Sequence, residues 1–201
     1  MSANTIEMPP YQRLYRKLKQ YATVDTETFH ALQEILSYKT IEKDDYITPF
    51  YEARRHIGFV LDGIIRVYHL NEDGTEYNKN FFVADDLFMT SLDERADSSV
   101  FVQSITTSQV LLFDYQDYMT LAEKYEVLES ILNKILLEYM TQKQNREIEL
   151  LALDAKDRYA MFVKTDPILS RVLPQFHIAS YLGITPTQLS RVRKAYTPQH
   201  M

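Results

Sequence analysis

Residues 175–196, QFHIASYLGITPTQLSRVRKAY, form the most informative segment of the sequence. Ile178, Ala179 and Leu182 give its first part an apolar face with helical spacing. Gly183 predicts the end of this helix, because glycine tolerates the left-handed backbone conformation that a helix stop needs. We therefore expect a short helix followed by a tight turn.

A second helix should begin directly after the turn. Residues 185–188, Thr-Pro-Thr-Gln, have the form of a capping box with proline at the first helical position. Leu189, Val192 and Tyr196 lie within about 60° of one another at about 100° per residue and should face the core. The opposite face collects Thr187, Ser190, Arg191 and Lys194. A DNA major groove admits such a face, although the spacing alone also fits a helical hairpin with a solvated basic face.

The pattern I-A-x-Y-L-G-I-T-x-x-x-L-S-R-x-R-K resembles the helix-turn-helix of the Crp/Fnr family of bacterial transcription regulators. Many family members carry a Glu that contacts cytosine and, four residues later, an Arg that contacts guanine. Here Thr187 occupies the Glu position, and Arg191 keeps the Arg position, so the half-site should differ. The residues expected to bind DNA are Thr185, Thr187, Gln188, Ser190, Arg191, Arg193 and Lys194.

Composition excludes several classes of protein. The chain of 201 residues has 45% hydrophobic residues, enough for a buried core, and no apolar run of about 18 residues that would span a membrane. It has no cysteine, which excludes disulfides and Cys-ligated iron–sulfur clusters. Its N-terminus lacks the apolar segment of a signal peptide. We therefore expect a cytoplasmic protein.

Charge is distributed unevenly along the chain. The net charge is −6, but residues 154–201 carry seven basic and three acidic residues, a local charge of +4. Residues 1–153 carry 15 basic and 25 acidic residues, or −10. This segregation is compatible with a DNA-binding module attached to a sensory or dimerising body.

The first half reads as helical over residues 11–37, with Asp25 or Thr26 as a cap, and then as short strands. Asp62-Gly63 and residues 71–74 look like hairpin connections. Strands this short and close in sequence predict an antiparallel sandwich or roll. FVLDGIIRVYHLNEDGTEY, residues 59–77, resembles the β-roll of the cyclic-nucleotide-binding domain in the Crp/Fnr family.

Residues 118–153 contain no Gly or Pro, which favours a long helix. We expect a break in this helix near Tyr125. The resemblance implies that two chains dimerise along it. The expected seam is Leu128, Ile131, Leu132, Ile135, Leu136 and Tyr139. The alternative is a helix packed on the β-roll of its own chain. Asp154 should cap the next helix.

These elements together predict an α+β fold in three parts. Residues 1–117 form a jelly-roll-like antiparallel β-roll, residues 118–153 the dimerisation helix, and residues 154–201 the helix-turn-helix domain. Family members often carry a β-hairpin wing after the motif. Only residues 197–201 follow it here, so the expected wing is reduced or absent.

The effector pocket lacks the residues that the resemblance would require for a cyclic phosphate. The family's Gly-Glu pair falls near Met89-Thr90, and its Arg-Ser pair falls on Ser98-Ser99. A buried phosphate without a guanidinium partner would be costly. We therefore expect no tight cyclic-nucleotide binding and an unidentified effector, if any. Candidate pocket residues are Phe88, Thr90, Ser98, Ser99 and Tyr139.

The sequence therefore predicts a homodimeric transcription regulator that binds double-stranded DNA at a pseudo-palindromic operator, with RNA polymerase as a further candidate partner. An adaptor or ligand-binding module that has lost sequence-specific DNA binding is the alternative. An enzyme is not expected, because no nucleophile elbow, phosphate-binding glycine loop or metal-ligand cluster is present. We expect no catalytic residues, no metal, no cofactor and no membrane contact.

Overall fold

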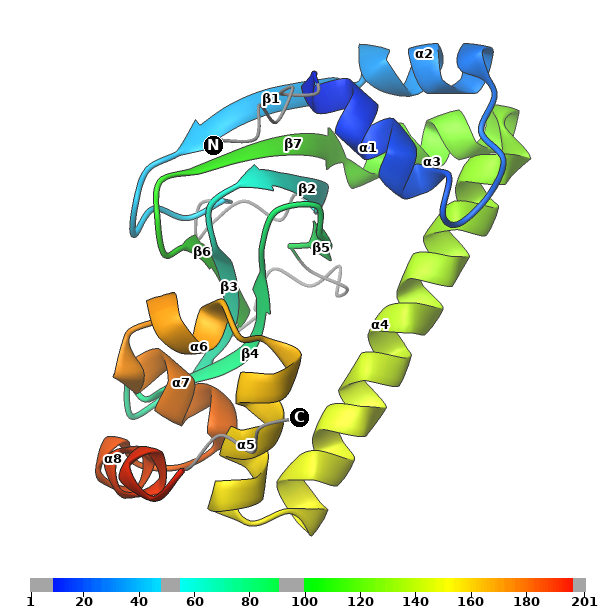
Figure 1. The fold of residues 1–201 in the computed structure, drawn as a ribbon. Helices are drawn as coiled ribbons and strands as arrows, with labels where there is room; N and C mark the ends of the chain where they lie inside the picture. Colours follow the sequence, from blue (N-terminus) through cyan, green and yellow to red (C-terminus); the bar gives the residue numbers. More distant parts are fainter. Residues whose placement is uncertain (1–8, 48–54, 91–99, 197–201) are drawn as a thin grey trace, which may run out of the picture. The chain divides into compact units, whose positions relative to one another are not determined.

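The computed structural model describes residues 9–47, 55–90 and 100–196 (Figure 1). The chain has an α+β fold made of two compact units. The roll unit comprises Met1–Val67 and Phe81–Leu137, and the C-terminal unit comprises Tyr68–Asn80 and Glu138–Met201. The three functional parts expected from the sequence, with boundaries at residues 117 and 153, do not coincide with these two units and stay a prediction.

Two antiparallel sheets carry the strands. The first has the order β1-β7-β2-β5, and the second has the order β4-β3-β6. Their bounds are β1 Leu36–Ile41, β2 His56–Asp62, β3 Ile65–Leu70, β4 Glu76–Phe82, β5 Leu87–Met89, β6 Val100–Ser104 and β7 Ser108–Asp114. In the first sheet β7 pairs with both β1 and β2, placing Phe113 opposite Leu36 on one side and Ile57 on the other.

The two expected hairpins have different outcomes. The turn at residues 71–74 does join the neighbouring strands β3 and β4, and Asn71 N donates to Thr75 O at 3.0 Å. The expectation for Asp62-Gly63 is wrong, because β2 and β3 lie in different sheets. Gly63 has a φ of 93°, which allows the chain to turn from one sheet into the other.

The N-terminal helical segment is shorter than expected. It forms α1 (Pro10–Leu18) and α2 (Thr26–Glu34), and the chain enters β1 at Leu36. Asp25 caps α2 as predicted, accepting a hydrogen bond from Thr28 N at 2.7 Å. The prediction of a helix up to residue 37 is wrong at its end, because residues 36–41 pair with β7 as a strand. The local spacing of apolar residues does not reveal such a long-range pairing.

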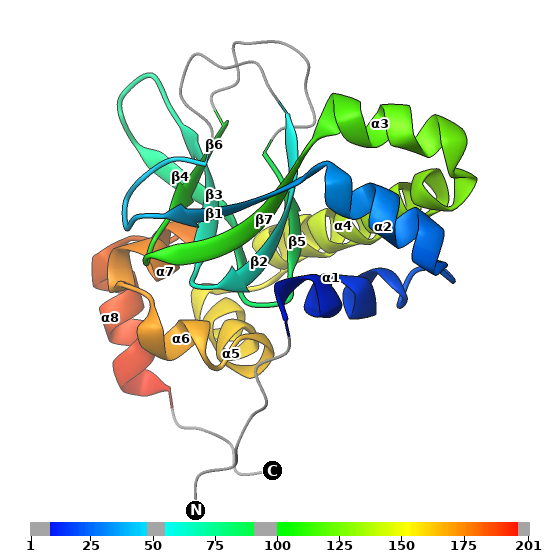
Figure 2. The same cartoon turned by 90° about the horizontal axis from the view of Figure 1, so that it is seen from above.

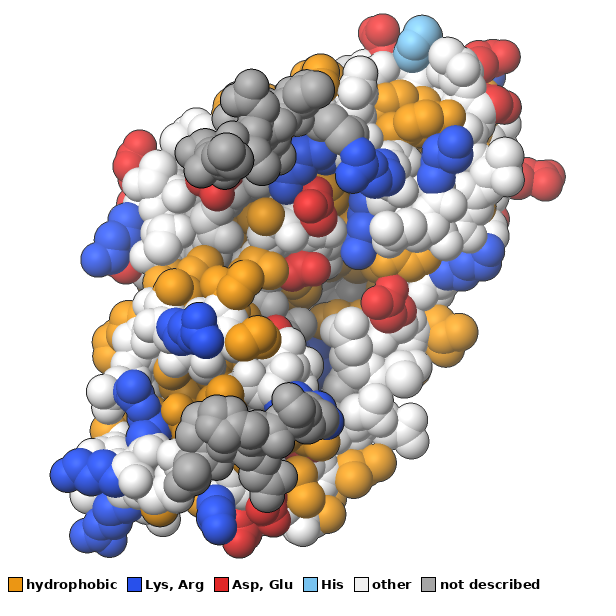
Figure 3. All heavy atoms as spheres, in the orientation of Figure 1, with side chains coloured by type: hydrophobic (Ala, Val, Ile, Leu, Met, Phe, Trp, Pro, Cys, Tyr) orange, Lys and Arg blue, Asp and Glu red, His pale blue; other side chains and the backbone are white. Residues whose placement is uncertain are grey.

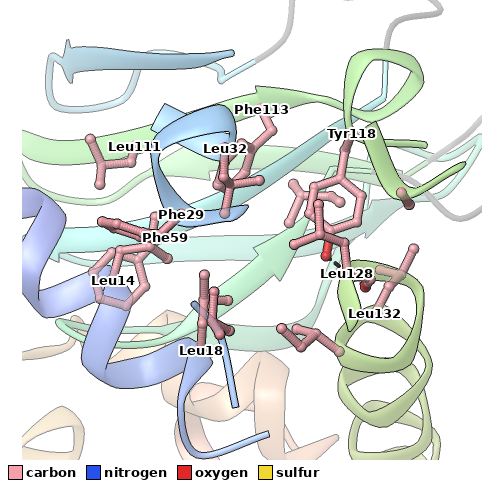
Figure 4. Packing of buried hydrophobic residues seen from close by; sticks show 14 of the residues in the cluster. Leu14, Leu18, Phe29, Leu32, Phe59, Leu111, Phe113, Tyr118, Leu128 and Leu132 are labelled. Atoms are coloured by element: carbon pink, nitrogen blue, oxygen red, sulfur yellow. Dashed lines mark hydrogen bonds between the residues drawn. The ribbon is translucent and has the colours of Figure 1, made fainter. Parts of the chain in front are cut away.

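The core of the roll unit lies between the first sheet and helices α1, α2 and α3 (Tyr115–Lys124), which lie beside that sheet in Figures 1 and 2. Phe59, Leu111 and Phe113 supply the strand side, and Leu14 and Phe29 come from the helices (Figure 4). All five side chains are less than one tenth exposed. Burial of aromatic and aliphatic surface of this kind is the main term that stabilises such a domain.

The long helical region breaks at Tyr125 as predicted, and α4 runs over Glu126–Ala152. Its first turns belong to the roll unit's own core. Leu128 and Ile131 are fully buried, and Leu132 is 4% exposed. Tyr118 of α3 donates its hydroxyl hydrogen to Leu128 O at 2.9 Å (Figure 4).

This packing involves part of the expected dimer seam, which stays a prediction. Leu128, Ile131 and Leu132 pack in the core cluster of their own chain. Ile135 and Leu136 pack against the same cluster from its edge. The large exposed apolar side chains of α4 come later in the helix: Leu137, Met140, Ile148, Leu150 and Leu151.

The C-terminal unit holds four further helices: α5 (Ala155–Thr165), α6 (Leu169–Val172), α7 (Gln175–Leu182) and α8 (Pro186–Ala195). Asp154 caps α5 as predicted, accepting hydrogen bonds from the backbone N–H groups of Lys156 and Asp157. The buried apolar side chains of these helices are Tyr159, Phe162, Leu169, Ile178, Ala179, Leu182 and Leu189. Across the described part of the chain, no helix combines the length and apolar character needed to cross a membrane.

Candidate nucleic-acid interface

The turn between α7 and α8 is closed by backbone hydrogen bonds. Gly183 has a φ of 65° and a ψ of 37°, the left-handed conformation expected of a helix-ending glycine. Ile184 N donates to Ala179 O at 3.0 Å, and Gly183 N donates to Ser180 O at 3.2 Å. These bonds satisfy the last carbonyl groups of α7 and fix the direction in which the chain enters α8.

A reciprocal cap begins α8. Gln188 N donates to the Thr185 hydroxyl at 3.1 Å, and Thr185 N donates to Gln188 Oε1 at 2.9 Å. Pro186 takes the first helical position, where its missing N–H costs nothing. The hydroxyl of Thr185 and the amide of Gln188 are therefore engaged in the cap, although both were expected to contact DNA.

The inner face of α8 is anchored in the C-terminal unit. Leu189 is fully buried, and Val192 and Tyr196 are half-buried. The ring of Tyr196 meets Tyr159 of α5 edge-on, with the ring centres 5.4 Å apart. Helix α8 thus packs on both α5 and α7, which holds its opposite face in a fixed orientation within the unit.

The outer face of α8 is polar and basic, as the spacing predicted. Thr187, Arg191 and Lys194 are exposed, as is Arg193 towards the edge, whereas Ser190 is half-buried. Within residues 9–47, 55–90 and 100–196, none of the three cations forms an ion pair with a carboxylate. Figure 3 shows Lys and Arg side chains gathered over α8, at the lower left. Three unneutralised cations on one protruding helix are suited to phosphate and guanine contacts.

No family model matches the chain, and no curated protein matches it in sequence. Solved structures do match its fold. FixK2 from Bradyrhizobium japonicum superposes with a TM-score of 0.68 at 20% identity, covering 80% of this chain and 84% of that one. The chain has the Crp/Fnr fold.

Two further structures with this fold match most of the chain. A putative transcriptional regulator of the crp/fnr family from Eubacterium rectale gives a TM-score of 0.67 at 12% identity, covering 93% of this chain and 87% of its own. CLP from Xanthomonas campestris gives a TM-score of 0.62 at 18% identity, covering 85% of this chain and 91% of its own. The likeness therefore extends over most of the chain.

The expected effector pocket is only partly visible in this Crp/Fnr-like chain. Phe88 is 2% exposed and Thr90 is 5% exposed, both in the roll unit. The Thr90 hydroxyl accepts a hydrogen bond from His56 N at 2.8 Å, so this oxygen is already used within the fold. Ser98 and Ser99 lie outside the described residues, and Tyr139 belongs to the C-terminal unit. The pocket therefore stays a prediction.

Tyr139 has a different neighbour, the ammonium group of Lys143, which lies 4.9 Å from its ring centre. Lys143 is half-buried, and its Nζ donates to Lys79 O at 3.1 Å. Burial, with repulsion from Lys79 and Arg146, lowers the pKa of Lys143 to about 8. Arg146 pairs with Glu149 at 2.9 Å and stacks on Tyr181.

The sequence did not reveal one set of buried polar residues in the C-terminal unit. Asn78 of β4 and His177 of α7 are 6% and 7% exposed, and they contact each other. They are 99 residues apart in sequence, and nothing in the local pattern of either segment indicates the pairing. As for metals, no group of three His, Cys, Asp or Glu side chains suited to an ion occurs among the residues that the structure describes.

Proposed function

We propose that this chain is a DNA-binding transcription regulator of the Crp/Fnr type. The observation that carries the proposal is α8, whose capped start, buried Leu189 and exposed Arg191 and Lys194 present a rigid basic face. A helix of about 10–12 Å diameter fits the major groove of B-DNA, which is about 12 Å wide. The match to FixK2 and to the putative regulator from Eubacterium rectale supports this function.

In this proposal Arg191 reads a guanine, and Thr187 contacts a base edge or a thymine methyl group. Lys194, Arg193 and Ser190 hold phosphates. Gln188 contributes less than the sequence suggested, because its side-chain oxygen accepts a hydrogen bond in the helix cap.

The active form in this proposal is a homodimer, with α4 as the interface. Met140, Ile148 and Leu151 are 66%, 55% and 82% exposed, so a second chain could bury their apolar surface. At about 100° per residue they lie within about 80° of one another, on one side of the helix, with the polar residues Gln144 and Glu147 between them along the axis. The seam thus lies nearer to the DNA-binding end of α4 than the sequence predicted.

Such a dimer would act in the cytoplasm on a pseudo-palindromic operator, with half-sites about 34 Å apart. Regulation through RNA polymerase is part of the proposal. The effector is unidentified and is not a cyclic nucleotide, because the Glu and Arg that would hold the ribose and the phosphate are replaced. Isothermal titration with cyclic AMP and cyclic GMP should show no binding at micromolar concentrations.

The decisive experiment is selection of bound sequences from random double-stranded DNA, with and without small-molecule extract from cells. A regulator should enrich one palindromic motif, and an extract-dependent change in enrichment would reveal an effector. If wild-type protein enriches no motif under either condition, the chain is an adaptor that has lost sequence-specific DNA binding. A matched selection with Arg191→Ala separates true base recognition from retention by charge alone.

A further inference from the structure

The turn of the β3–β4 hairpin and the strand ends beside it, Tyr68–Asn80, belong to the same compact unit as the helices α5 to α8. Among the described residues of that unit, these are the only strand segments. In the sheet order, β4 is an edge strand, so its outer backbone groups need partners from outside the sheet. Helix α7 supplies those partners.

Ser180 of α7 binds the edge of β4 through a single hydroxyl. Its Oγ donates to Glu76 O at 2.8 Å and accepts from Asn78 N at 2.9 Å. The Ser180 hydroxyl thus satisfies one backbone donor and one backbone acceptor of β4, as a neighbouring strand would do.

Asn78 makes the reverse contact, from the strand to the helix. Its Nδ2 donates to His177 O at 3.1 Å and lies 3.2 Å from His177 Nδ1, the geometry of an accepting ring nitrogen. Both side chains are buried, so removal of the amide would leave polar atoms of α7 without water to replace it.

These contacts hold α7 without covering the face of α8 that would meet DNA. Ser180 and His177 lie in α7, and Ile178, Ala179 and Leu182 of the same helix fill the unit's apolar core. Helix α8 packs on α7, and its Thr187, Arg191 and Lys194 stay exposed while the hairpin is docked.

We propose that the β3–β4 hairpin is a working part of the DNA-binding unit and that Asn78 and Ser180 are positioning residues for the recognition helix. They fix α7, and α7 fixes α8 through the closed turn at Gly183. This inference rests on the proposed function and deepens it. Strand β4, which binds α7, continues along the chain into the roll unit. A change in strand position caused by an effector would therefore reach α8 through this contact.

The test compares full-length wild type with Asn78→Ala, Ser180→Ala, their double variant and Ser180→Thr. The last keeps a hydroxyl at position 180 and should restore wild-type behaviour. Asn145→Ala is the matched control, because Asn145 is an exposed asparagine of α4 in the same unit. Two readouts are needed: amide hydrogen exchange in α7 and α8, and affinity for the selected operator relative to unrelated DNA.

Removal of either positioning side chain should speed exchange of α7 and α8 amides about tenfold, with β7 of the roll unit unchanged as an internal standard. Operator affinity should fall about tenfold while binding to unrelated DNA stays the same, because non-specific binding depends on positive charge, which these variants keep. The double variant should show less than the sum of the two single effects, as expected for one shared contact.

Unchanged exchange in both single variants would overturn the proposal, and so would tighter operator binding, which would mean that the hairpin holds α7 in a position unfit for DNA. If wild type binds no DNA sequence at all, the proposed function fails. The exchange data would then still decide whether the hairpin holds α7.

Discussion

Thr185 and Gln188 cap the candidate recognition helix reciprocally, with hydrogen bonds of 3.1 and 2.9 Å between each side chain and the other's backbone N–H. Thr185→Ala should therefore lower the free energy of unfolding of the C-terminal unit by about 1 kcal/mol. Thr185→Ser keeps the hydroxyl and should lose little. Thr187→Ala is the control, because Thr187 is exposed in the same turn and should leave urea unfolding unaltered. Equal stability of Thr185→Ala and wild type would show that the cap contributes nothing.

Gly58 lies opposite Phe88 in the pairing of β2 with β5, and a methyl group at Gly58 would come within 2.1 Å of the Phe88 ring. Gly58→Ala should therefore destabilise the roll unit by about 1–3 kcal/mol through overpacking. Adding Phe88→Leu should recover part of the stability. Gly74→Ala is an instructive comparison: nothing lies within 4 Å of its added methyl, and its cost comes from the φ of 82° alone. Thermal unfolding followed by circular dichroism measures all three variants.

Leu128 and Leu151 lie on the same helix and should respond to mutation in opposite ways. Leu128 is fully buried in its own chain, so Leu128→Ala should cost about 2–5 kcal/mol of folding stability. Leu151 is 82% exposed, so Leu151→Glu should leave the circular dichroism spectrum intact and convert dimer to monomer. Met140→Glu should act in the same way. Sedimentation equilibrium distinguishes the species, and a dimer that survives both charged substitutions would place the interface elsewhere.

Lys143 should make stability depend on pH in the alkaline range. Burial, with Lys79 and Arg146 nearby, lowers its pKa from 10.5 to about 8 in the folded chain. Below pH 8 both states are protonated, and the folded chain carries the full cost of the buried charge. Between pH 8 and 10.5 the unfolded chain binds more protons, so this contribution to stability rises with pH.

Lys143→Met removes that charge and should stabilise the chain at pH 7 by on the order of 1 kcal/mol, after allowance for partial exposure. The advantage should shrink as the pH rises from 8 to 10.5. Exposed Lys156→Met should show no such trend in urea unfolding at matched pH, and a constant difference for Lys143→Met would contradict the assignment.

Local signals in the sequence account for the elements that local chemistry determines. The stop at Gly183 and the caps at Asp25, Asp154 and Thr185 all depend on residues within one helical turn. The errors involve partners that are distant in sequence. Strand β1 exists because β7, about 70 residues later, pairs with it, and β2 and β3 lie in different sheets although only two residues join them.

The candidate DNA face was predictable for the same local reason, since helical spacing alone separates Leu189 from Thr187 and Arg191. The hairpin contact was not, because Asn78 and Ser180 lie about one hundred residues apart and each is an ordinary polar residue in its own segment. Only the three-dimensional arrangement shows that the Ser180 hydroxyl binds the backbone of β4 and that the Asn78 amide binds the backbone of α7.

Arg191 and Lys194 should give distinct signatures in DNA binding, because a base contact carries sequence information and a phosphate contact does not. Arg191→Ala should cost about 1–3 kcal/mol on the selected operator and relax the preference at one base pair of each half-site, with unrelated DNA bound nearly as before. Lys194→Ala should weaken binding to every sequence equally and make the slope of log K against log salt shallower by about one for each phosphate that is no longer neutralised. Fluorescence anisotropy over a salt series, with operator and scrambled duplexes, measures both effects. If Arg191→Ala weakens all duplexes equally, Arg191 binds a phosphate and the base reader must be sought at Thr187.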